Sequence, residues 1–100
     1  SKVEAGPEPV FSDGEPPVAG AAPLEAEATR AIAEGDTEAA LLAYTDLGMM
    51  LENHQHFHLA LKAYRNAAQL APEEGVVHNN LGSALRKLGR AGEAAEAYAR

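Results

Sequence analysis

The sequence has no cysteine and no tryptophan, and only 5% of its 100 residues are aromatic. The missing cysteine excludes disulfide scaffolds, thiolate zinc sites and cysteine nucleophiles. Basic residues are few, 8 against 15 acidic ones, and the net charge of −7 argues against a nucleic-acid-binding surface. No apolar run is long enough to span a membrane. We therefore expect one small acidic domain whose partners are neither nucleic acid nor membrane.

Proline and glycine are concentrated at the start of the chain. Residues 1–23 hold five of the six prolines, and their apolar residues follow no period. Proline removes backbone donors, and such a segment cannot bury enough apolar area to offset the entropy lost on ordering. We therefore predict a disordered, acidic, Pro/Gly-rich arm over residues 1–23. The alternative is a short extended motif that docks elsewhere, with Val10 and Phe11 as its anchor.

From residue 24 onward the composition changes to alanine, leucine and glutamate, and the apolar residues recur at helical steps. Gly35 ends one helix, and Asp36 is placed to cap the next. Because the connections are short, sequential helices should be antiparallel neighbours in an all-α fold. The pattern contains no strand candidate. The predicted helices cover residues 24–34, 37–53, 57–70, 75–88 and 91–100.

An internal repeat with a period of 34 residues is the strongest pattern in the chain. The pair Leu47-Gly48 recurs as Leu81-Gly82, and Tyr64 recurs as Tyr98. Two further pairs with this offset are Leu51 with Leu85 and Ala60 with Ala94. A helix–turn–helix unit of this length is typical of tetratricopeptide repeats, and the chain resembles that family over about 60 of its residues.

This resemblance implies an α-solenoid of stacked antiparallel hairpins. Residues 24–100 would form the helical domain. Within it we expect a divergent N-terminal hairpin or cap over 24–40, a complete repeat over 41–74 and a truncated repeat over 75–100. The truncation would leave the apolar side of the last helix uncovered. We therefore expect either fraying of residues 91–100 or self-association through this end.

The glycines and tyrosines that recur in both repeats can be explained by helix packing. Gly48 and Gly82 carry no side chain, so a neighbouring helix can approach closely at both positions. We expect Tyr64 and Tyr98 to fill the wedge toward the next repeat.

Three histidines, His54, His56 and His58, invite a metal-binding interpretation. They lie where the family places the turn between two helices, and a turn does not force three rings to converge. We therefore expect no metal site, and a pH-sensitive surface patch is the better interpretation. The paired carboxylates are interpreted as solvated helix faces. The sequence predicts no catalytic residue and no cofactor.

The first helix of each hairpin in this family lines a concave groove. An asparagine directly before Leu-Gly resembles the asparagines with which such repeats hold extended peptides, and Asn80 occupies that position. Its amide can donate and accept at once, and nearby cations suit a partner with acidic groups. The alternative is that Asn80 only bonds a neighbouring helix, and the first repeat carries Asp46 instead. The predicted partner-binding residues are Asn79, Asn80, Ser83, Arg86 and Lys87.

Two functions are compatible with these observations. The first is a non-catalytic interaction module that binds a partner protein or peptide in the groove. The second is the repeat region of a longer enzyme, such as a glycosyltransferase or another transferase, that recruits its protein substrate. Residues 79–90 resemble bacterial repeats that precede such domains. In either case the predicted residues bind rather than catalyse.

Overall fold

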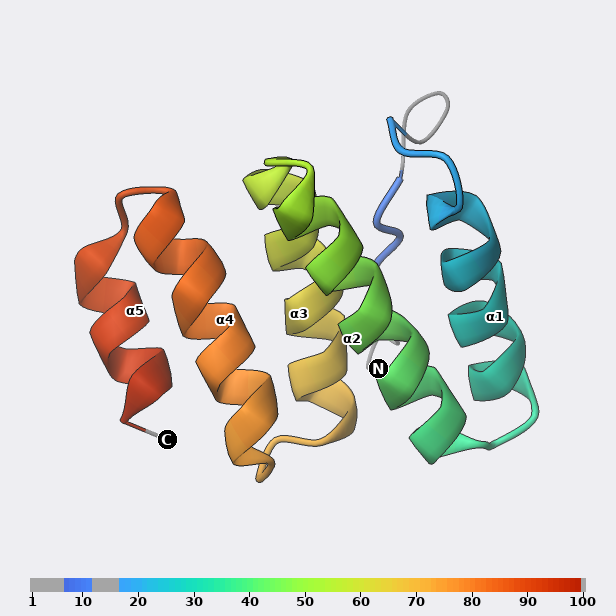
Figure 1. Cartoon of the computed structure of the whole chain (residues 1–100). Coiled ribbons are helices and arrows are strands. Elements are labelled where there is room, and N and C mark those ends of the chain that lie inside the picture. Colours follow the sequence, from blue (N-terminus) through green and yellow to red (C-terminus); the bar gives the residue numbers. More distant parts are fainter. Residues whose placement is uncertain (1–6, 12–16, 100) are drawn as a thin grey trace.

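The computed structural model describes residues 7–11 and 17–99. In these residues the chain forms helices joined by short turns, and no strand occurs among them, so the predicted all-α repeat fold is confirmed. Each helix runs antiparallel to the one before it and packs against it (Figure 1). The helices are α1 (Ala21–Ala33), α2 (Thr37–Asn53), α3 (Phe57–Leu70), α4 (Gly75–Lys87) and α5 (Ala91–Tyr98).

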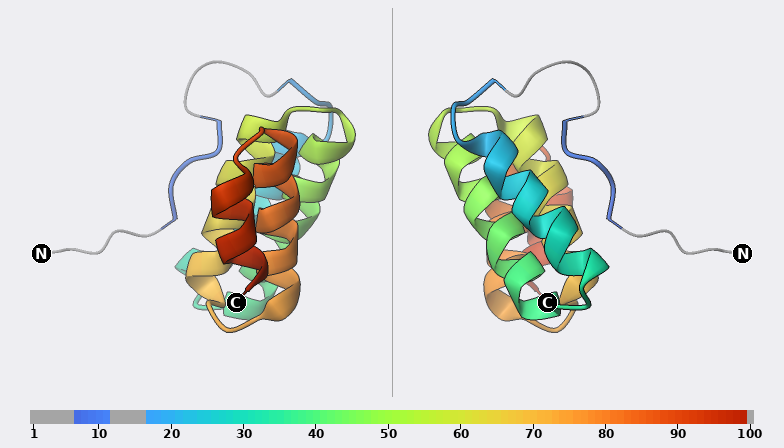
Figure 2. Two further views of the ribbon diagram at one scale, coloured as in Figure 1. Left: turned by 90° about the vertical axis from the view of Figure 1, so that its left-hand side faces the viewer. Right: turned by 90° about the vertical axis from the view of Figure 1, so that its right-hand side faces the viewer.

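The two hairpins, α2–α3 and α4–α5, stack with their first helices on the same side. Figure 2 shows α2 and α4 on one side of the molecule and α3 and α5 on the other. We call the exposed surface of α2 and α4 the front face, and the surface of α3 and α5 the back face. Helix α1 packs on α2 and α4 packs on α3, so the first hairpin lies between two neighbours.

A tyrosine lies on a glycine inside each hairpin. A Cβ atom added at Gly82 would come within 2.7 Å of the Tyr98 ring, and one at Gly48 would come closer still to Tyr64. The predicted close approach at these glycines is therefore confirmed. Each ring packs against the glycine of its own hairpin, and the filling of the wedge toward the next repeat stays a prediction.

The turns within the two hairpins have the same backbone geometry, but different residues occupy the position with positive φ. Gly89 ends α4 with φ 79°, and the Arg90 N–H donates to the Leu85 carbonyl over 2.9 Å. Gln55 holds the equivalent place after α2 with φ 66°. A side chain in this left-handed conformation costs roughly 1–2 kcal/mol. The turn of the first hairpin is therefore strained at Gln55, while glycine removes this strain from the turn of the second.

The start of the chain departs from the prediction of a disordered arm. Residues 7–11 lie extended along the back of the helices, and Val10 is fully buried in the core. Helix α1 also begins at Ala21, three residues before the predicted start. Pro23 fits there because the first turn of a helix has no use for its missing N–H.

Residues 7–11 therefore differ from the disorder prediction and follow the alternative of a docked motif, with Val10 buried and Phe11 packed against the core. The physical reason is that two adjacent apolar side chains and paired backbone groups hold the short segment on the helices, and this needs no apolar period. Residues 1–6 and 12–16 of the predicted arm lie outside the described residues.

Candidate partner-binding surface

The five predicted binding residues lie on the solvent side of α4. Asn79, Arg86 and Lys87 are exposed, while Asn80 and Ser83 are half-buried. They recur at steps of three and four residues, which places them on one broad side of the helix. Their partners, however, differ from residue to residue.

Glu52 near the end of α2 binds two of them. The Ser83 hydroxyl donates to Glu52 Oε2 over 2.7 Å, and Lys87 Nζ lies 2.8 Å from the same oxygen. The Tyr64 hydroxyl donates to Oε1 over 2.7 Å. One carboxylate thus connects α2, α3 and α4. Sequence reasoning missed it because its partners lie 12, 31 and 35 residues away, none of which matches the repeat period.

The charge state of Glu52 follows from these contacts. Burial by itself would raise the pKa of this carboxyl group, but Lys87, Ser83 and Tyr64 stabilise the anion and lower the pKa below its ordinary value. Burial, together with the neighbouring carboxylate, raises the pKa of Tyr64 far above its ordinary value. Tyr64 therefore stays a hydrogen-bond donor and Glu52 stays charged at neutral pH.

The pairing with Glu52 changes what the α4 surface can offer a partner. Lys87 already has a carboxylate and lies over the Phe57 ring, 5.7 Å from its centre. Arg86 has no ion-pair partner in the described part of the chain, so of these two α4 cations it is the one without a carboxylate of its own. Asn79 and Asn80 add amide groups beside it.

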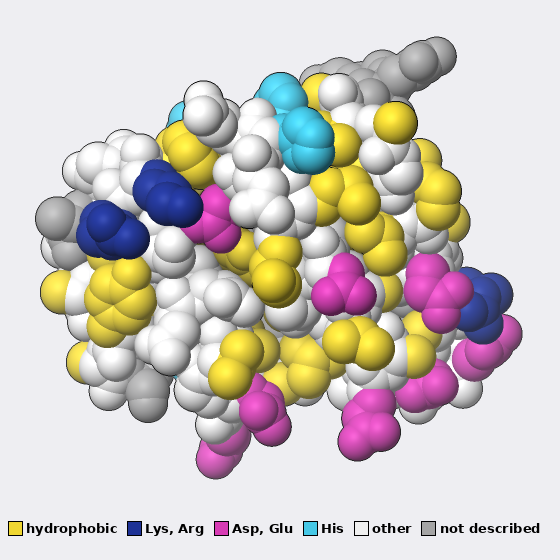
Figure 3. Space-filling view, viewed as in Figure 1, with side chains coloured by type: hydrophobic (Ala, Val, Ile, Leu, Met, Phe, Trp, Pro, Cys, Tyr) yellow, Lys and Arg dark blue, Asp and Glu magenta, His cyan; other side chains and the backbone are white. Residues whose placement is uncertain are grey.

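The front face also carries exposed apolar side chains. Leu42 on α2 is 62% exposed and Val76 on α4 is 63% exposed, and these two positions are one repeat period apart. Met49 on α2 is exposed as well. Figure 3 shows hydrophobic side chains across this face, with two cationic side chains at one end and an acidic one beside them, and further acidic side chains near the middle and along other edges. The face therefore offers apolar contacts next to amides and a cation.

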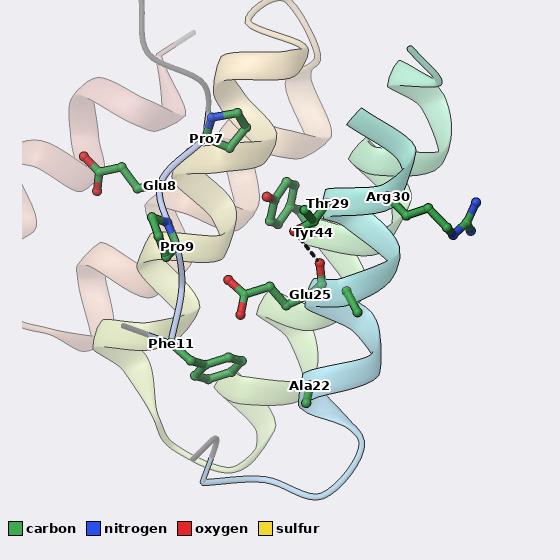
Figure 4. Close-up of a pocket in the computed structure, with 10 residues that line it drawn as sticks. Pro7, Glu8, Pro9, Phe11, Ala22, Glu25, Thr29, Arg30 and Tyr44 are labelled. Carbon is green, nitrogen blue, oxygen red and sulfur yellow. Dashed lines mark hydrogen bonds between the residues drawn. The ribbon is translucent and has the colours of Figure 1, made fainter. Parts of the chain in front are cut away.

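An asparagine does hold an extended backbone in this structure, but it is Asn66 on the back face. Its Oδ1 accepts from the Glu8 N–H over 3.0 Å, and its Nδ2 donates to the Glu8 carbonyl over 2.6 Å. Figure 4 shows the segment between α3 and α1. Asn66 lies among the alanines of α3, and a buried amide needs a hydrogen-bond partner. This was the sign in the sequence that another segment contacts α3 here. Asn80 makes no comparable contact with the described residues and stays a prediction.

The histidines of the first hairpin turn do not gather around a common point. His54 Nδ1 lies 3.0 Å from the Met50 carbonyl oxygen, and His58 is exposed in the first turn of α3. Among the residues that the structure describes, no group of three histidine or acidic side chains is placed to hold a metal ion.

Comparison with known proteins places one repeat in a family. Residues 76–100 match the family described as tetratricopeptide repeat. No curated protein matches the chain, and no solved structure matches it. None of the helices in residues 7–11 and 17–99 is long and apolar enough to cross a membrane. The match, the 34-residue period and the paired hairpins agree, and together they support a fold of tetratricopeptide repeats.

Proposed function

We propose that this protein is a non-catalytic interaction module that binds a segment of a partner protein on its front face. Tetratricopeptide repeats in general mediate interactions between proteins. The observation that carries the proposal is the pair Leu42 and Val76. These equivalent positions of two successive repeats both present a large apolar side chain to solvent. Repeated exposure of apolar side chains on one face is typical of a binding surface.

The chemistry of the face favours a partner segment with both apolar and acidic groups. Val76 and Met49 offer apolar contact, Asn80 can both donate to and accept from a peptide backbone, and Arg86 can bind a carboxylate. If the repeats belong to a longer transferase, as residues 79–90 suggest by resemblance, the same surface would hold the protein substrate. The mode of binding is the same in both settings.

Peptides selected from a displayed random library against this chain provide the test. We expect Arg86→Ala and Asn80→Ala each to weaken binding of the selected peptides by about 1–3 kcal/mol, as for lost charged or buried hydrogen bonds. Neither change should alter the unfolding midpoint much, because both side chains reach solvent. Binding is measured by isothermal titration calorimetry.

Matched controls lie on the back face. Arg65→Ala removes an exposed arginine of α3, and Gln69→Ala removes an exposed amide of the same helix. Neither should change the affinity of front-face peptides. Peptides that respond to the two controls but not to Arg86→Ala and Asn80→Ala would show that the front face is not the binding surface.

A further inference from the structure

Residues 7–11 lie in a groove between α1 and α3 and are held mainly through their backbone. Asn66 of α3 bonds both the N–H and the carbonyl of Glu8, and Glu25 of α1 accepts from the Val10 N–H over 2.6 Å. Val10 is fully buried, whereas the Glu8 side chain points away from α1 (Figure 4). These contacts require an extended backbone and one small apolar side chain, so a different segment with those two properties can make them as well.

The segment fills its groove only in part. An open cleft of about 790 Å³ remains between residues 7–11 and α1. Figure 4 shows the Tyr44 ring between the segment and the helix. The apolar residues that line the cleft are Pro7, Pro9, Phe11, Ala22 and Ala26. A ligand with a longer side chain in place of Pro9 therefore has room to extend toward α1.

Two polar groups in the cleft can accept a further hydrogen bond. Tyr44 is 3% exposed, and its hydroxyl makes no hydrogen bond with the described residues. Burial, together with the nearby charge of Glu25, raises the pKa of Tyr44, so the hydroxyl keeps its proton and its oxygen can still accept. Glu25 uses Oε2 for the Val10 N–H, and its other oxygen has no partner among the described residues. A donor brought by a ligand would satisfy both groups.

The charge directed into the cleft is negative. Figure 4 shows the Glu25 side chain directed toward the segment. Arg30 is the one cation among the described residues that line the cleft, but it is directed away and pairs with Glu27 and, over 3.1 Å, with Glu34. Because Arg30 already has two carboxylates and Glu25 has no cation, the cleft favours a positively charged donor.

We propose that this groove is a binding site for an extended segment of a partner protein, and that residues 7–11 occupy it in cis. A small apolar residue of the partner takes the place of Val10. The basic residue directly before it takes the place of Pro9 and binds Glu25 and the Tyr44 hydroxyl. A short tethered segment acts at an effective concentration in the millimolar range, so the partner needs these additional contacts to displace it. A second copy of this chain brings proline at that position and lacks them.

This site lies on the back face and is therefore separate from the proposed front-face site. Nuclear magnetic resonance titration of the full chain tests it with three capped heptapeptides: the sequence of residues 6–12, the same sequence with Pro9→Lys, and the same sequence with Pro9→Glu. The chain is titrated unmodified and as the variant Val10→Asp, in which a charge at a buried position releases the cis segment. Circular dichroism shows whether the helices are retained. Val10→Ala is the milder variant and should give the same order of affinities.

In the Val10→Asp chain we expect the lysine peptide to shift the amide signals of Asn66 and Glu25. It should bind about threefold to tenfold more tightly than the other two peptides, the range for one hydrogen bond. The unmodified chain should bind it roughly tenfold more weakly, because residues 7–11 compete. Tyr44→Phe and Glu25→Gln, each combined with Val10→Asp, should reduce the preference for lysine. Glu38→Gln is the matched control, because this exposed carboxylate does not line the cleft.

Four results would overturn the proposal. The first is equal affinity for the three peptides, which would make a second copy as good an occupant as a basic partner segment. The second is the absence of shifts with every peptide at millimolar concentration in both Val10 variants. The third is shifts confined to α2 and the outer side of α4, which would place the peptides on the front face. The fourth is equal affinity of the lysine peptide for the unmodified chain and the Val10→Asp chain, because residues 7–11 would then not compete with it.

Discussion

The two hairpins of this molecule use the same contact in different surroundings. In α2–α3 the Tyr64 ring lies on Gly48 and is 1% exposed, while in α4–α5 the Tyr98 ring lies on Gly82 and is 45% exposed. The first hairpin has α1 on one side and α4 on the other. Among the described residues, the second packs against the first hairpin on one side only, mainly through α3. The same tyrosine–glycine contact is therefore buried or exposed according to the helices that pack around its hairpin.

The polar contacts differ in the same way. The Tyr64 hydroxyl is bonded to Glu52, which also binds Ser83 and Lys87 of the next hairpin. No described residue gives the Tyr98 hydroxyl such a partner. The carboxylate therefore fixes the first hairpin to the second, and we expect the first hairpin to be the more sensitive to substitution.

The largest expected difference is between Gly48→Ala and Gly82→Ala. A methyl group at residue 48 would enter the buried Tyr64 ring, which cannot move without disturbing the core. We expect a loss of about 1–3 kcal/mol in the free energy of unfolding, as for other overpacked cores. Tyr98 can turn toward solvent, so Gly82→Ala should cost less. Urea denaturation followed by circular dichroism measures both.

The two variants are each other's control, because the chemical change and the helix position are the same. Equal losses for the two would contradict the claim that burial of the tyrosine decides the cost.

A smaller difference is expected when the tyrosine hydroxyl is removed. Tyr64→Phe takes one donor from Glu52 and should cost about 1 kcal/mol, because the carboxylate keeps two other partners. Tyr98→Phe should be nearly neutral. The pKa of Glu52 is lowered in the folded state, so its contribution to stability is present above its unfolded-state pKa of about 4.3 and is lost as the pH falls through the lower folded-state pKa.

The cost of Tyr64→Phe should therefore be larger at about pH 7 than at about pH 3, which lies below the ordinary pKa of an unfolded-state glutamate. Chemical denaturation at the two pH values gives this difference. A cost that is the same at both would mean that the hydroxyl does not stabilise the charged carboxylate.

Much of the fold could be predicted because its signals are local and repeated. The helical period, the glycine turns and the 34-residue offset placed α2 and α3 at the bounds observed. The close approach at Gly48 and Gly82 followed from the same repetition. These features depend on residues near one another in the chain or on a spacing that occurs twice.

The contacts that escaped prediction join residues that no period relates. Asn66 and Glu8 are 58 residues apart, and Glu52 and Ser83 are 31 apart. A proline-rich start without an apolar period favours disorder, yet Val10 is fully buried and Phe11 packs against the core. The proposed binding residues of α4 could be placed on one side of their helix, but the pairing of Lys87 with Glu52 could be found only from the position of α2 beside α4.

Residues 7–11 cover the first hairpin from behind, and none of the described residues does the same for the second. Amide hydrogen exchange at Glu8 and Val10 tests this most directly, because both N–H groups donate to side chains of the helices. We predict exchange slower than in a free peptide of the same sequence, and faster exchange at Glu8 in the Asn66→Ala variant. Exchange at the free-peptide rate in the unaltered chain would mean that residues 7–11 do not dock on the helices.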